Sequence, residues 1–394
     1  MGMDKRRVCC FCEKWESGGI ESFLHNVIMA MDLSRMEIDI VAAQMCESVF
    51  TAGLKEKGVH FYELSGNQRK LGKNHKMFKQ LLKERQYDVV HLNIFQGLSL
   101  YYAYLAKKAG VRKIIAHSHN SALRQSKTKW LKMLLHNVGK NLWTENATDY
   151  WACSKPAAEF MFTPKSLCKY EFIPNGIDVE RFRFNEDFRK QIRRDLNIED
   201  KLVIGNVGRL CYQKNQEYLL EVFARLQSQR PDSVLLLVGE GELKVELQQK
   251  AEKLGVADKV IFYGVTDKIE QLLWAMDIFV FPSCFEGLGI VVVEAQAAGL
   301  QCLVSDQVTR EAALTELVVY KSIEEPPVSW ACEIMRNAKK AMCREEHSET
   351  IKKVFIDKGF DVRQQAAAME AFYISGVNPP GHVTPCRSFD KKGR

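Results

Sequence analysis

Hydrophobic and polar positions alternate in blocks along most of the chain. Short apolar runs, typical of buried parallel strands, are separated by longer segments in which apolar residues recur at helical spacing. This order predicts βαβ units, and therefore parallel sheets covered by helices. The predicted strands are 8–12, 38–42, 60–63, 89–92, 113–117, 149–153, 203–207, 234–238, 260–262, 278–281 and 302–305. The clearest predicted helices are 21–31, 75–85, 98–109, 216–229, 242–254 and 268–276.

The blocks fall into two groups, and the length of 394 residues is too great for one ordinary core. A turn at Pro174–Gly176, followed by the charged segment 182–196, separates the groups. We therefore expect an α/β protein with two doubly wound domains that face each other across a cleft and bind ligands at the carboxyl ends of their strands. The expected limits are 1–178, 179–376 and a disordered tail, 377–394.

The composition is that of a soluble enzyme, with 46% hydrophobic and 27% charged residues. No segment approaches 18 uninterrupted apolar residues, so the sequence predicts no membrane-spanning helix. The twelve cysteines are scattered, and Cys9, Cys10 and Cys12 have no second pair of ligands at zinc spacing. We therefore expect reduced thiols and a cytoplasmic protein.

Charge is distributed unevenly, although the net charge is only +7. Between Arg69 and Lys140 there are 16 basic residues and two acids, whereas the second half of the chain is nearly neutral. The first half is therefore expected to meet an anionic partner. The chain contains no recognised nucleic-acid-binding module, so nucleic acid is not expected to be that partner.

The segment KTKWLKMLLHNVGKNLW, residues 127–143, has the pattern of an amphipathic helix with lysines mainly on its flanks. Its apolar side consists of Trp130, Leu131, Leu134, Leu135, Val138 and Leu142. One interpretation is a helix that lies on the anionic inner surface of a membrane, which would make the protein peripheral on the cytoplasmic face. The other interpretation is an ordinary surface helix whose apolar side belongs to the core.

The stretch GNVGRLCYQKN, residues 205–215, carries the first candidate chemistry. It follows a predicted strand and precedes a predicted helix, and its glycines allow a sharp turn. Arg209 and Lys214 stand beside the start of the helix, where a phosphate group finds free N–H groups, a helix dipole and two cations. The stretch is neither a dinucleotide fingerprint nor a Walker A sequence. The alternative is that both cations are simply solvated.

The stretch EGLGIVVVEAQAAGL, residues 286–300, carries the second candidate site. It follows the predicted strand 278–281, and we expect its β-branched run to be the buried face of a helix that begins near Ile290. Glu286 precedes this helix and Glu294 lies about one turn into it. Two carboxylates that face a cleft would suit sugar hydroxyl groups. The alternative is two solvated acids at a helix start.

Glu286 and Glu294, with seven residues between them, resemble the E-x7-E signature of family-4 retaining glycosyltransferases with the GT-B fold. Other stretches are similar to that family and occur in the same order: GGIESF at 18–23, HLN at 91–93, AHSHN at 116–120, PNGID at 174–178, GRLCYQKN at 208–215 and VGEGEL at 238–243. The similarity runs from about residue 8 to about residue 330. Within the family, the sequence looks most like bacterial enzymes that build capsular polysaccharides and exopolysaccharides.

The resemblance implies roles for the matching positions of the C-terminal domain. Arg209 and Lys214 would hold the diphosphate of a nucleotide-sugar donor. Glu294 would bind the ribose hydroxyls, and Glu286 would contact hydroxyls of the transferred sugar.

Further donor contacts are implied at positions with no charge. The main chain at Leu288, Gly289 and Ile290 would help to bind the phosphates and the sugar. Val265 and Thr266 would lie against the base.

In the N-terminal domain, the resemblance implies that Gly18 and Gly19 form a loop that closes over the donor. His119 matches the active-site histidine of the family. The sequence reads His-Ser-His-Asn here, where many members have one histidine followed by Asp. His117 therefore stays an alternative to His119.

The sequence thus predicts a retaining glycosyltransferase that moves a sugar from a nucleotide-sugar, with a UDP-sugar as first choice, to a glycan or a polyprenyl-diphosphate-linked glycan in capsule or exopolysaccharide biosynthesis. The expected catalytic residues are His119, Glu286, Arg209 and Lys214. No Asp-x-Asp motif of metal-dependent glycosyltransferases is present, so we expect neither a metal nor an organic cofactor. The same-face mechanism proposed for the family fits better than a covalent intermediate, because no nucleophile stands out. The alternatives are a GT-B sugar-nucleotide epimerase and an inactive sugar-nucleotide-binding protein.

Overall fold

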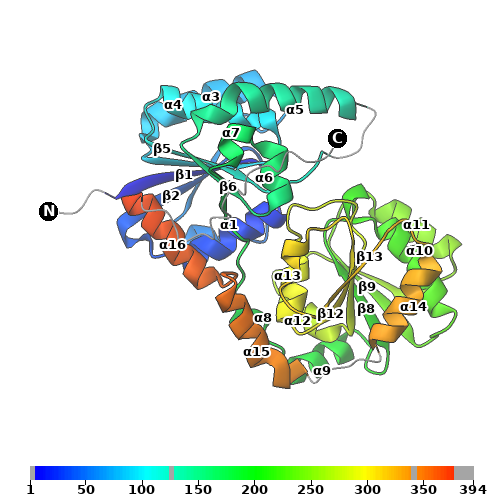
Figure 1. Cartoon of the computed structure of the whole chain (residues 1–394). Coiled ribbons are helices and arrows are strands. Elements are labelled where there is room, and N and C mark those ends of the chain that lie inside the picture. Colours follow the sequence, from blue (N-terminus) through cyan, green and yellow to red (C-terminus); the bar gives the residue numbers. More distant parts are fainter. Residues whose placement is uncertain (1–4, 124–127, 339–343, 377–394) are drawn as a thin grey trace, which may run out of the picture. The chain divides into compact units, whose positions relative to one another are not determined.

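The computed structural model describes residues 5–123, 128–338 and 344–376, so the predicted tail 377–394 lies outside the described residues. The chain folds as two compact units. Unit 1 consists of Met1–Asn175 and Gln365–Arg394, and unit 2 consists of Gly176–Gln364. Each unit is a parallel sheet with helices packed on it (Figure 1), which confirms the predicted α/β class. The return of the chain to unit 1 after Gln364 has no counterpart in the predicted limits.

The sheet of unit 1 has seven strands in the order β3-β2-β1-β4-β5-β6-β7, and all neighbouring strands are parallel. The strands are β1 (Arg6–Trp15), β2 (Met36–Met45), β3 (His60–Glu63), β4 (Val89–Ile94), β5 (Lys113–Ser118), β6 (Asp149–Ala152) and β7 (Glu171–Phe172). The strand order reverses between β1 and β4. The carboxyl ends of these two strands therefore border the switch point at which doubly wound sheets bind ligands.

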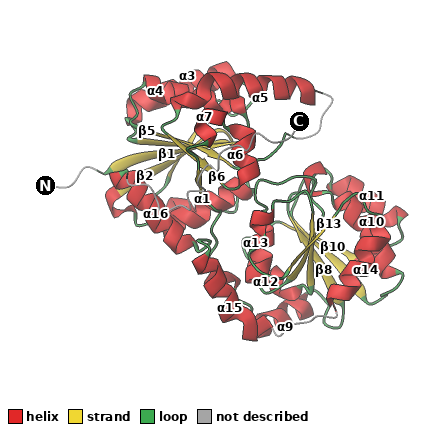
Figure 2. Ribbon diagram, viewed as in Figure 1, coloured by secondary structure: helices red, strands yellow, loops and turns green. Residues whose placement is uncertain are grey.

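Helices cover both faces of this sheet (Figure 2). One face carries α3 (Leu71–Arg85), η2 (Gly97–Leu100), α4 (Tyr101–Lys108) and α5 (Lys129–Trp143), and the other carries α1 (Gly19–Ala30) and α16 (Val362–Ser375). The other helical elements of the unit are η1 (Leu33–Arg35), α2 (Thr51–Glu56), η3 (Thr144–Asn146), α6 (Lys155–Met161) and α7 (Pro164–Leu167). In α16, the buried Phe372 packs on Trp151 of β6 with ring centroids 5.0 Å apart.

The sheet of unit 2 has six parallel strands in the order β10-β9-β8-β11-β12-β13. The strands are β8 (Leu202–Val207), β9 (Ser233–Val238), β10 (Val260–Gly264), β11 (Ile278–Phe281), β12 (Gln301–Ser305) and β13 (Val318–Lys321). The helices are α8 (Val179–Phe182), α9 (Glu186–Asp195), α10 (Gln216–Gln227), α11 (Lys244–Lys253), α12 (Ile269–Ala275), α13 (Ile290–Ala297), α14 (Pro327–Ala338) and α15 (Arg344–Asp357). Short 3-10 turns are η4 (Tyr212–Lys214), η5 (Ala257–Lys259) and η6 (Arg310–Ala312). Here the switch point lies between β8 and β11.

The β-branched run of residues 290–293 forms a helix and not a strand, as predicted. Val292 and Val293 are fully buried in α13, so the free energy of burial outweighs the weak strand preference of valine. Gly289 precedes the helix with φ of 81°, a left-handed conformation that side-chain-bearing residues rarely adopt. This glycine therefore fixes how the chain leaves the β11 loop and enters α13.

Part of the core of unit 2 lies between the sheet and the helices α10 and α14. Trp330 of α14 is fully buried, and its indole N–H donates to Ser322 O at 2.8 Å. Its ring meets Tyr218 of α10 edge-on, with centroids 5.7 Å apart. Burial of a large apolar side chain contributes roughly 1.5–3 kcal/mol, so this layer holds the strands that carry the loops described below.

Two expectations from composition concern membrane spans and thiols. None of the helices in the described part of the chain has the length and apolar character needed to cross a bilayer. The ten cysteines within the described ranges are free thiols. Cys9, Cys10 and Cys12 are buried in β1, and burial raises the pKa of each thiol.

Candidate functional site

Two loops of unit 2 meet at the switch point of its sheet. One follows β8 and spans residues 208–215, and the other follows β11 and spans residues 282–289. Their backbones are joined by a hydrogen bond from Cys284 N to Gln213 O at 2.8 Å. The two stretches that the sequence singled out separately therefore form one site.

An ion pair between Lys214 and Glu286 connects these loops. Lys214 Nζ lies 2.7 Å from Glu286 Oε1, and Gln213 Nε2 donates to Glu286 Oε2 at 3.2 Å. The side chains of Lys214 and Glu286 are only 16% and 8% exposed, so the pair is largely shielded from water. Lys214 Nζ also lies 4.7 Å from the centre of the Phe281 ring. The arrangement holds a cation and a carboxylate in fixed positions at the ligand-binding edge of the sheet.

Two further polar atoms at this edge are buried without a hydrogen-bond partner among the described residues. They are Ser283 Oγ, in the loop after β11, and Gln216 Oε1, at the start of α10. A buried polar atom without a partner costs roughly 1–3 kcal/mol, so such atoms are expected where a ligand or water completes the site.

Arg209 occupies the outer part of the same loop. Its Nε donates to Glu242 Oε2 at 3.2 Å, and its side chain is about half-exposed. The residue before it, Gly208, donates its backbone N–H to Val238 O at the end of β9, at 2.9 Å, so the start of this loop lies beside β9. The side chain of Arg209 is thus more exposed than that of Lys214, 48% against 16%, and is accessible to a charged ligand.

Glu294 lies inside α13 and is almost completely buried. Burial raises the pKa of Glu294 to about 8; Arg181 of α8 opposes this shift and Glu270 of α12 adds to it. Arg181 is itself held by Glu270, with Nη2 to Oε2 at 2.7 Å. At neutral pH the carboxyl group of Glu294 therefore keeps its proton and can donate as well as accept a hydrogen bond.

The uncharged positions implied by the resemblance lie on two other loops of unit 2. Val265 and Thr266 follow β10, where Val265 is 47% exposed and Thr266 Oγ1 accepts from Lys268 N at 3.0 Å. Leu288 and Ile290 flank Gly289 at the start of α13 and are both buried. The α13 start therefore offers main-chain groups, whereas Val265 offers an exposed apolar surface.

In unit 1, Gly18 and Gly19 follow β1 at the carboxyl edge of the sheet. Gly18 precedes α1 in an extended conformation, and Gly19 is the first residue of that helix. Glu21, one turn further on, is buried, and burial raises its pKa to about 8. The structure thus places the glycine pair at the switch point of unit 1, at the start of a helix.

The two candidate histidines have different environments. His117 is fully buried at the end of β5, and its Nδ1 is 3.1 Å from His91 Nε2. His119 lies just beyond β5, is partly exposed, and its Nε2 is 2.9 Å from Asn93 Oδ1. Because the amide oxygen only accepts, His119 Nε2 carries the proton in this contact and Nδ1 is the free acceptor. Although part of this residue is exposed, its Nδ1 is buried, and burial lowers the pKa of His119 to about 3, so its ring is neutral at physiological pH.

The sequence reasoning missed the residue that anchors the histidine group. Tyr373 of α16 has its hydroxyl 2.7 Å from His91 Nδ1, which extends the chain of contacts from His117 through His91 to α16. The motif HLN gave a signal for His91, but no sequence feature pointed to Tyr373. The sequence reasoning also missed three residues that act on the site carboxylates. Arg181 and Glu270 act on Glu294 from distant helices, and Gln213 donates to Glu286 from a polar loop position.

The same geometry shows whether side chains of the described residues are grouped to bind a metal ion. Within the described ranges, no group of three or more His, Cys, Asp or Glu side chains is placed to hold a metal ion. Burial lowers the pKa of His91 to about 3, so its ring is neutral at physiological pH. Metal independence itself stays a prediction.

Two doubly wound units with candidate residues at the carboxyl ends of their strands define the GT-B class. The structure is similar to that of Anabaena HepE in complex with UDP-glucose, with a TM-score of 0.75, 20% identity, and coverage of 92% of this chain and 98% of that chain. The family Glycosyltransferase Family 4 matches residues 17–181, and Glycosyl transferases group 1 matches residues 188–319. The chain belongs to the family-4-like glycosyltransferases with the GT-B fold, which confirms the resemblance seen in its motifs.

Relatives support this assignment along the whole chain. EpsF of Bacillus subtilis, which is named as a glycosyltransferase, is 30% identical over 380 residues, which are 95% of this chain and 97% of EpsF. The UDP-Gal:alpha-D-GlcNAc-diphosphoundecaprenol alpha-1,3-galactosyltransferase of Escherichia coli is 30% identical over 239 residues, which are 58% of this chain and 60% of that protein. The protein is therefore a glycosyltransferase.

Proposed function

We propose that this glycosyltransferase moves a sugar from a nucleotide-sugar, with a UDP-sugar as first choice, to a glycan or lipid-linked glycan acceptor, with retention of configuration and without a metal. The observation that carries the proposal is the Lys214–Glu286 ion pair at the switch point of unit 2. The names of the E. coli relative and of the HepE complex support the choice of UDP, and the name EpsF supports a role in exopolysaccharide or capsule biosynthesis.

Charge development on the leaving diphosphate explains the need for these cations. As the bond between the anomeric carbon and the phosphate oxygen breaks, negative charge grows on the diphosphate. Lys214, Arg209 and the N-terminus of α13 would stabilise that charge in place of a divalent cation. Charge-assisted hydrogen bonds contribute roughly 1.5–3 kcal/mol each, so two cations account for a substantial part of the barrier reduction.

Glu286, Glu294 and His119 would orient the donor. Glu286 accepts hydrogen bonds from hydroxyls of the transferred sugar, and protonated Glu294 donates to one ribose hydroxyl while it accepts from the other. We propose His119, rather than His117, as the active-site histidine, because His119 is partly exposed beyond β5 whereas His117 is fully buried. Each of the two rings has one nitrogen without a partner among the described residues, and a sugar hydroxyl would supply one for Nδ1 of His119.

The proposed transfer occurs on one face of the sugar. The acceptor oxygen forms its bond to the anomeric carbon on the face from which the diphosphate leaves. The proton of the acceptor hydroxyl passes to the leaving phosphate oxygen, so no protein nucleophile is required. The neutral state of His119 agrees with a role in binding and not in carrying a positive charge.

The proposed reaction predicts that free nucleoside diphosphate appears only when an acceptor glycan is present. The measurement is diphosphate release from a panel of nucleotide sugars, with and without acceptor. Release should persist in excess chelator, because the neutralising cations are part of the protein. Release without any acceptor would favour the epimerase alternative, and loss of activity in chelator that Mg²⁺ or Mn²⁺ restores would contradict metal independence.

The outer side of α5 supports a second part of the proposal, attachment to a membrane. All six apolar residues of that side are exposed, with Trp130 at 71%, Leu142 at 62% and Leu134 at 53%. The side that packs on the protein contains His136, Gly139 and Trp143. His136 Nδ1 accepts from Gly97 N at 2.9 Å, a Cβ on Gly139 would lie 2.4 Å from Gly97 O, and the centroid of the Trp143 ring lies 5.0 Å from that of Tyr101. The interpretation of α5 as a helix with its apolar side in the core is therefore wrong.

We propose that α5 lies on the anionic cytoplasmic face of the membrane, where a lipid-linked acceptor is found. Lys132 is exposed beside the apolar side, and near-surface lysines contribute about 1 kcal/mol each to binding of anionic lipids. Lys127, predicted to flank this helix, lies outside the described residues.

Replacement of Trp130, Leu134 and Leu142 by serine should abolish sedimentation with anionic vesicles at low salt. The three side chains are exposed, so the variant should stay folded. The matched control is Val245→Ser with Val328→Ser, two exposed apolar residues of unit 2. Equal binding of wild type and triple variant, or equal partitioning of the wild type onto neutral and anionic vesicles, would exclude this role of α5.

A further inference from the structure

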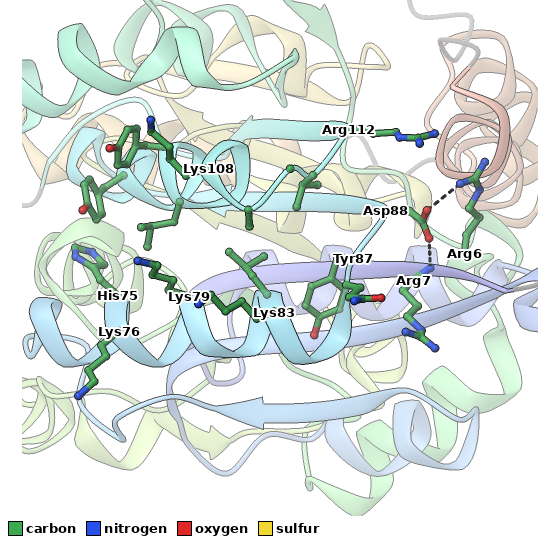
Figure 3. A pocket seen from close by; sticks show the side chains of 18 of the residues that line it. Arg6, Arg7, His75, Lys76, Lys79, Lys83, Tyr87, Asp88, Lys108 and Arg112 are labelled. Carbon is green, nitrogen blue, oxygen red and sulfur yellow. Dashed lines mark hydrogen bonds and ion pairs between the residues drawn. The ribbon is translucent and has the colours of Figure 1, made fainter.

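A large basic groove lies between α3 and α4 of unit 1, away from the residues described above (Figure 3). Its volume is about 1620 Å³. It reaches Arg6 at the start of β1 and Arg112 just before β5, and therefore the amino-terminal edge of the sheet. Gly18 and His119 lie at the opposite, carboxyl edge. The groove is thus separate from the glycine pair and the candidate histidine of this unit.

The positive charge in the groove has few counterions. Among the described residues that line it, Asp88 is the only acid, and Arg6 Nη1 binds this carboxylate at 2.9 Å. Lys76, Lys79 and Lys83 of α3 make no ion pair with any described residue. Figure 3 shows Lys79 and Lys83 on one wall, with Lys108 on the other. Uncompensated charge between low-dielectric walls produces a strong positive potential.

Compensation of helix dipoles explains only part of this pattern. Lys83 and Lys108 lie in the last turns of α3 and α4, where a cation favours the helix C-terminus by roughly 0.3–1 kcal/mol. Lys76 lies in the first half of α3 and Lys79 near its middle, and neither is in the last turn, to which the favourable effect of the dipole on a cation is confined. Their placement at i and i+3 puts both on the groove side of the helix.

One end of the groove is aromatic. His75 of α3 lies 4.4 Å from Tyr101 of α4, and Tyr101 lies 5.4 Å from Tyr104, measured between ring centroids. All three rings line the groove and are only partly buried. Such rings present an apolar face together with a polar group, and Lys108 Nζ lies 5.8 Å from the Tyr104 ring. This combination suits a ligand that has both flat apolar faces and hydroxyl groups.

We infer that the groove binds a linear glycan whose sugar units carry negative charges, as carboxylate or phosphate groups. The cations of α3 and α4 would contact the charges, and Tyr101 and Tyr104 would contact the sugar rings. Two facing walls suit a chain better than the flat surface of a bilayer. The choice of a glycan over other polyanions rests on the proposed function, since such an enzyme works beside the polymer that it helps to build. A polymer held here would raise the effective concentration of glycan at the protein.

The test measures binding of linear polygalacturonate to the full chain, with fully methyl-esterified polygalacturonate as the uncharged control. Wild type should bind the acidic form, more weakly as salt rises, and should not bind the ester. The variant Lys76→Glu/Lys79→Glu/Lys83→Glu should bind at least about tenfold more weakly. The matched control Lys201→Glu/Lys253→Glu/Lys353→Glu changes the same charge on exposed positions of unit 2 and should bind like wild type. Undiminished binding by the α3 variant would overturn the inference.

Binding of other polyanions tests whether the groove recognises sugar rings as well as negative charge. Tyr104→Ala should weaken polygalacturonate binding severalfold and leave binding of inorganic polyphosphate unchanged. Equal effects on both ligands, or tighter binding of single-stranded oligonucleotides or anionic vesicles through the same lysines, would overturn the glycan assignment. Lys214→Ala should retain polygalacturonate binding while it loses transfer. Absence of polygalacturonate binding would therefore contradict the groove inference, and unchanged transfer by Lys214→Ala would contradict the proposed donor site.

Discussion

Lys214→Ala should lower kcat/KM for the nucleotide-sugar by about 10²–10³. The physical reason is that Lys214 supplies a shielded positive charge where the leaving diphosphate becomes more negative. In the structure that charge is held 2.7 Å from Glu286, so it is already positioned before the donor arrives. Steady-state kinetics with the best donor from the panel, at fixed acceptor, measures the effect.

Stability must be separated from catalysis in this experiment. Removal of one partner from a largely buried ion pair leaves an uncompensated charge and costs about 3–5 kcal/mol. The double variant Lys214→Ala/Glu286→Gln removes that charge, so it should regain stability but not transfer. Lys250→Ala is the control for loss of a lysine elsewhere in unit 2, because it breaks the ion pairs of Lys250 on α11 with Glu217 and Glu221, both on α10. Near-full activity in a folded Lys214→Ala protein would show that the donor site has been assigned wrongly.

Glu294→Ala should also cost about 10²–10³ in kcat/KM, whereas Glu294→Gln should retain most activity near neutral pH. The difference follows from the pKa of Glu294, which burial raises to about 8. A protonated carboxyl group and a carboxamide both donate and accept hydrogen bonds, and alanine does neither. If the Gln and Ala variants are equally impaired, the ionised form of Glu294 must act in catalysis and this interpretation fails.

The raised pKa of Glu294 also predicts how the stability of the ligand-free protein changes with pH. The unfolded chain loses the Glu294 proton near the ordinary value of 4.5, and the folded protein keeps it up to about 8. The contribution of this group to stability is therefore complete below pH 4.5 and is lost as pH rises toward 8. Glutamine has no such proton, so the free energy of unfolding of wild type relative to Glu294→Gln should fall by about 1–3 kcal/mol between about pH 5 and pH 8. Glu21 and the buried histidines titrate alike in both proteins, so their contributions cancel when wild type is compared with Glu294→Gln. If the two free energies of unfolding differ by the same amount at every pH, Glu294 is not buried in its protonated form.

Most of the fold could be predicted because buried parallel strands leave a strong signal. The strands β3 and β11 coincide with the predicted 60–63 and 278–281. β7 and β13 were not predicted; β7 has only two residues, too few to show an apolar run. The run at residues 290–293 was predicted as a helix in spite of its strand-like composition, because the flanking glycines and the alanine-rich continuation marked both ends.

The candidate site was less accessible to sequence reasoning. The motifs identified Lys214 and Glu286, but their ion pair depends on two loops that are 72 residues apart in the chain. The environment of Glu294 depends on Arg181 and Glu270, which belong to two other helices and carry no local pattern. Tertiary contacts of this kind set a pKa or a side-chain orientation, and periodicity and spacing do not report them.

The return of the chain to unit 1 has a consequence for synthesis on the ribosome. Unit 2 is continuous, but unit 1 needs residues from Gln365 onward, including the buried Phe372 and Tyr373 of α16. These residues emerge only after the whole of unit 2 has been translated. At roughly 5–20 residues per second, the face of the first sheet that α16 covers waits on the order of ten to forty seconds for its last helix. During that interval the nascent first unit exposes the apolar surface around Trp151, and unit 2 has time to fold first.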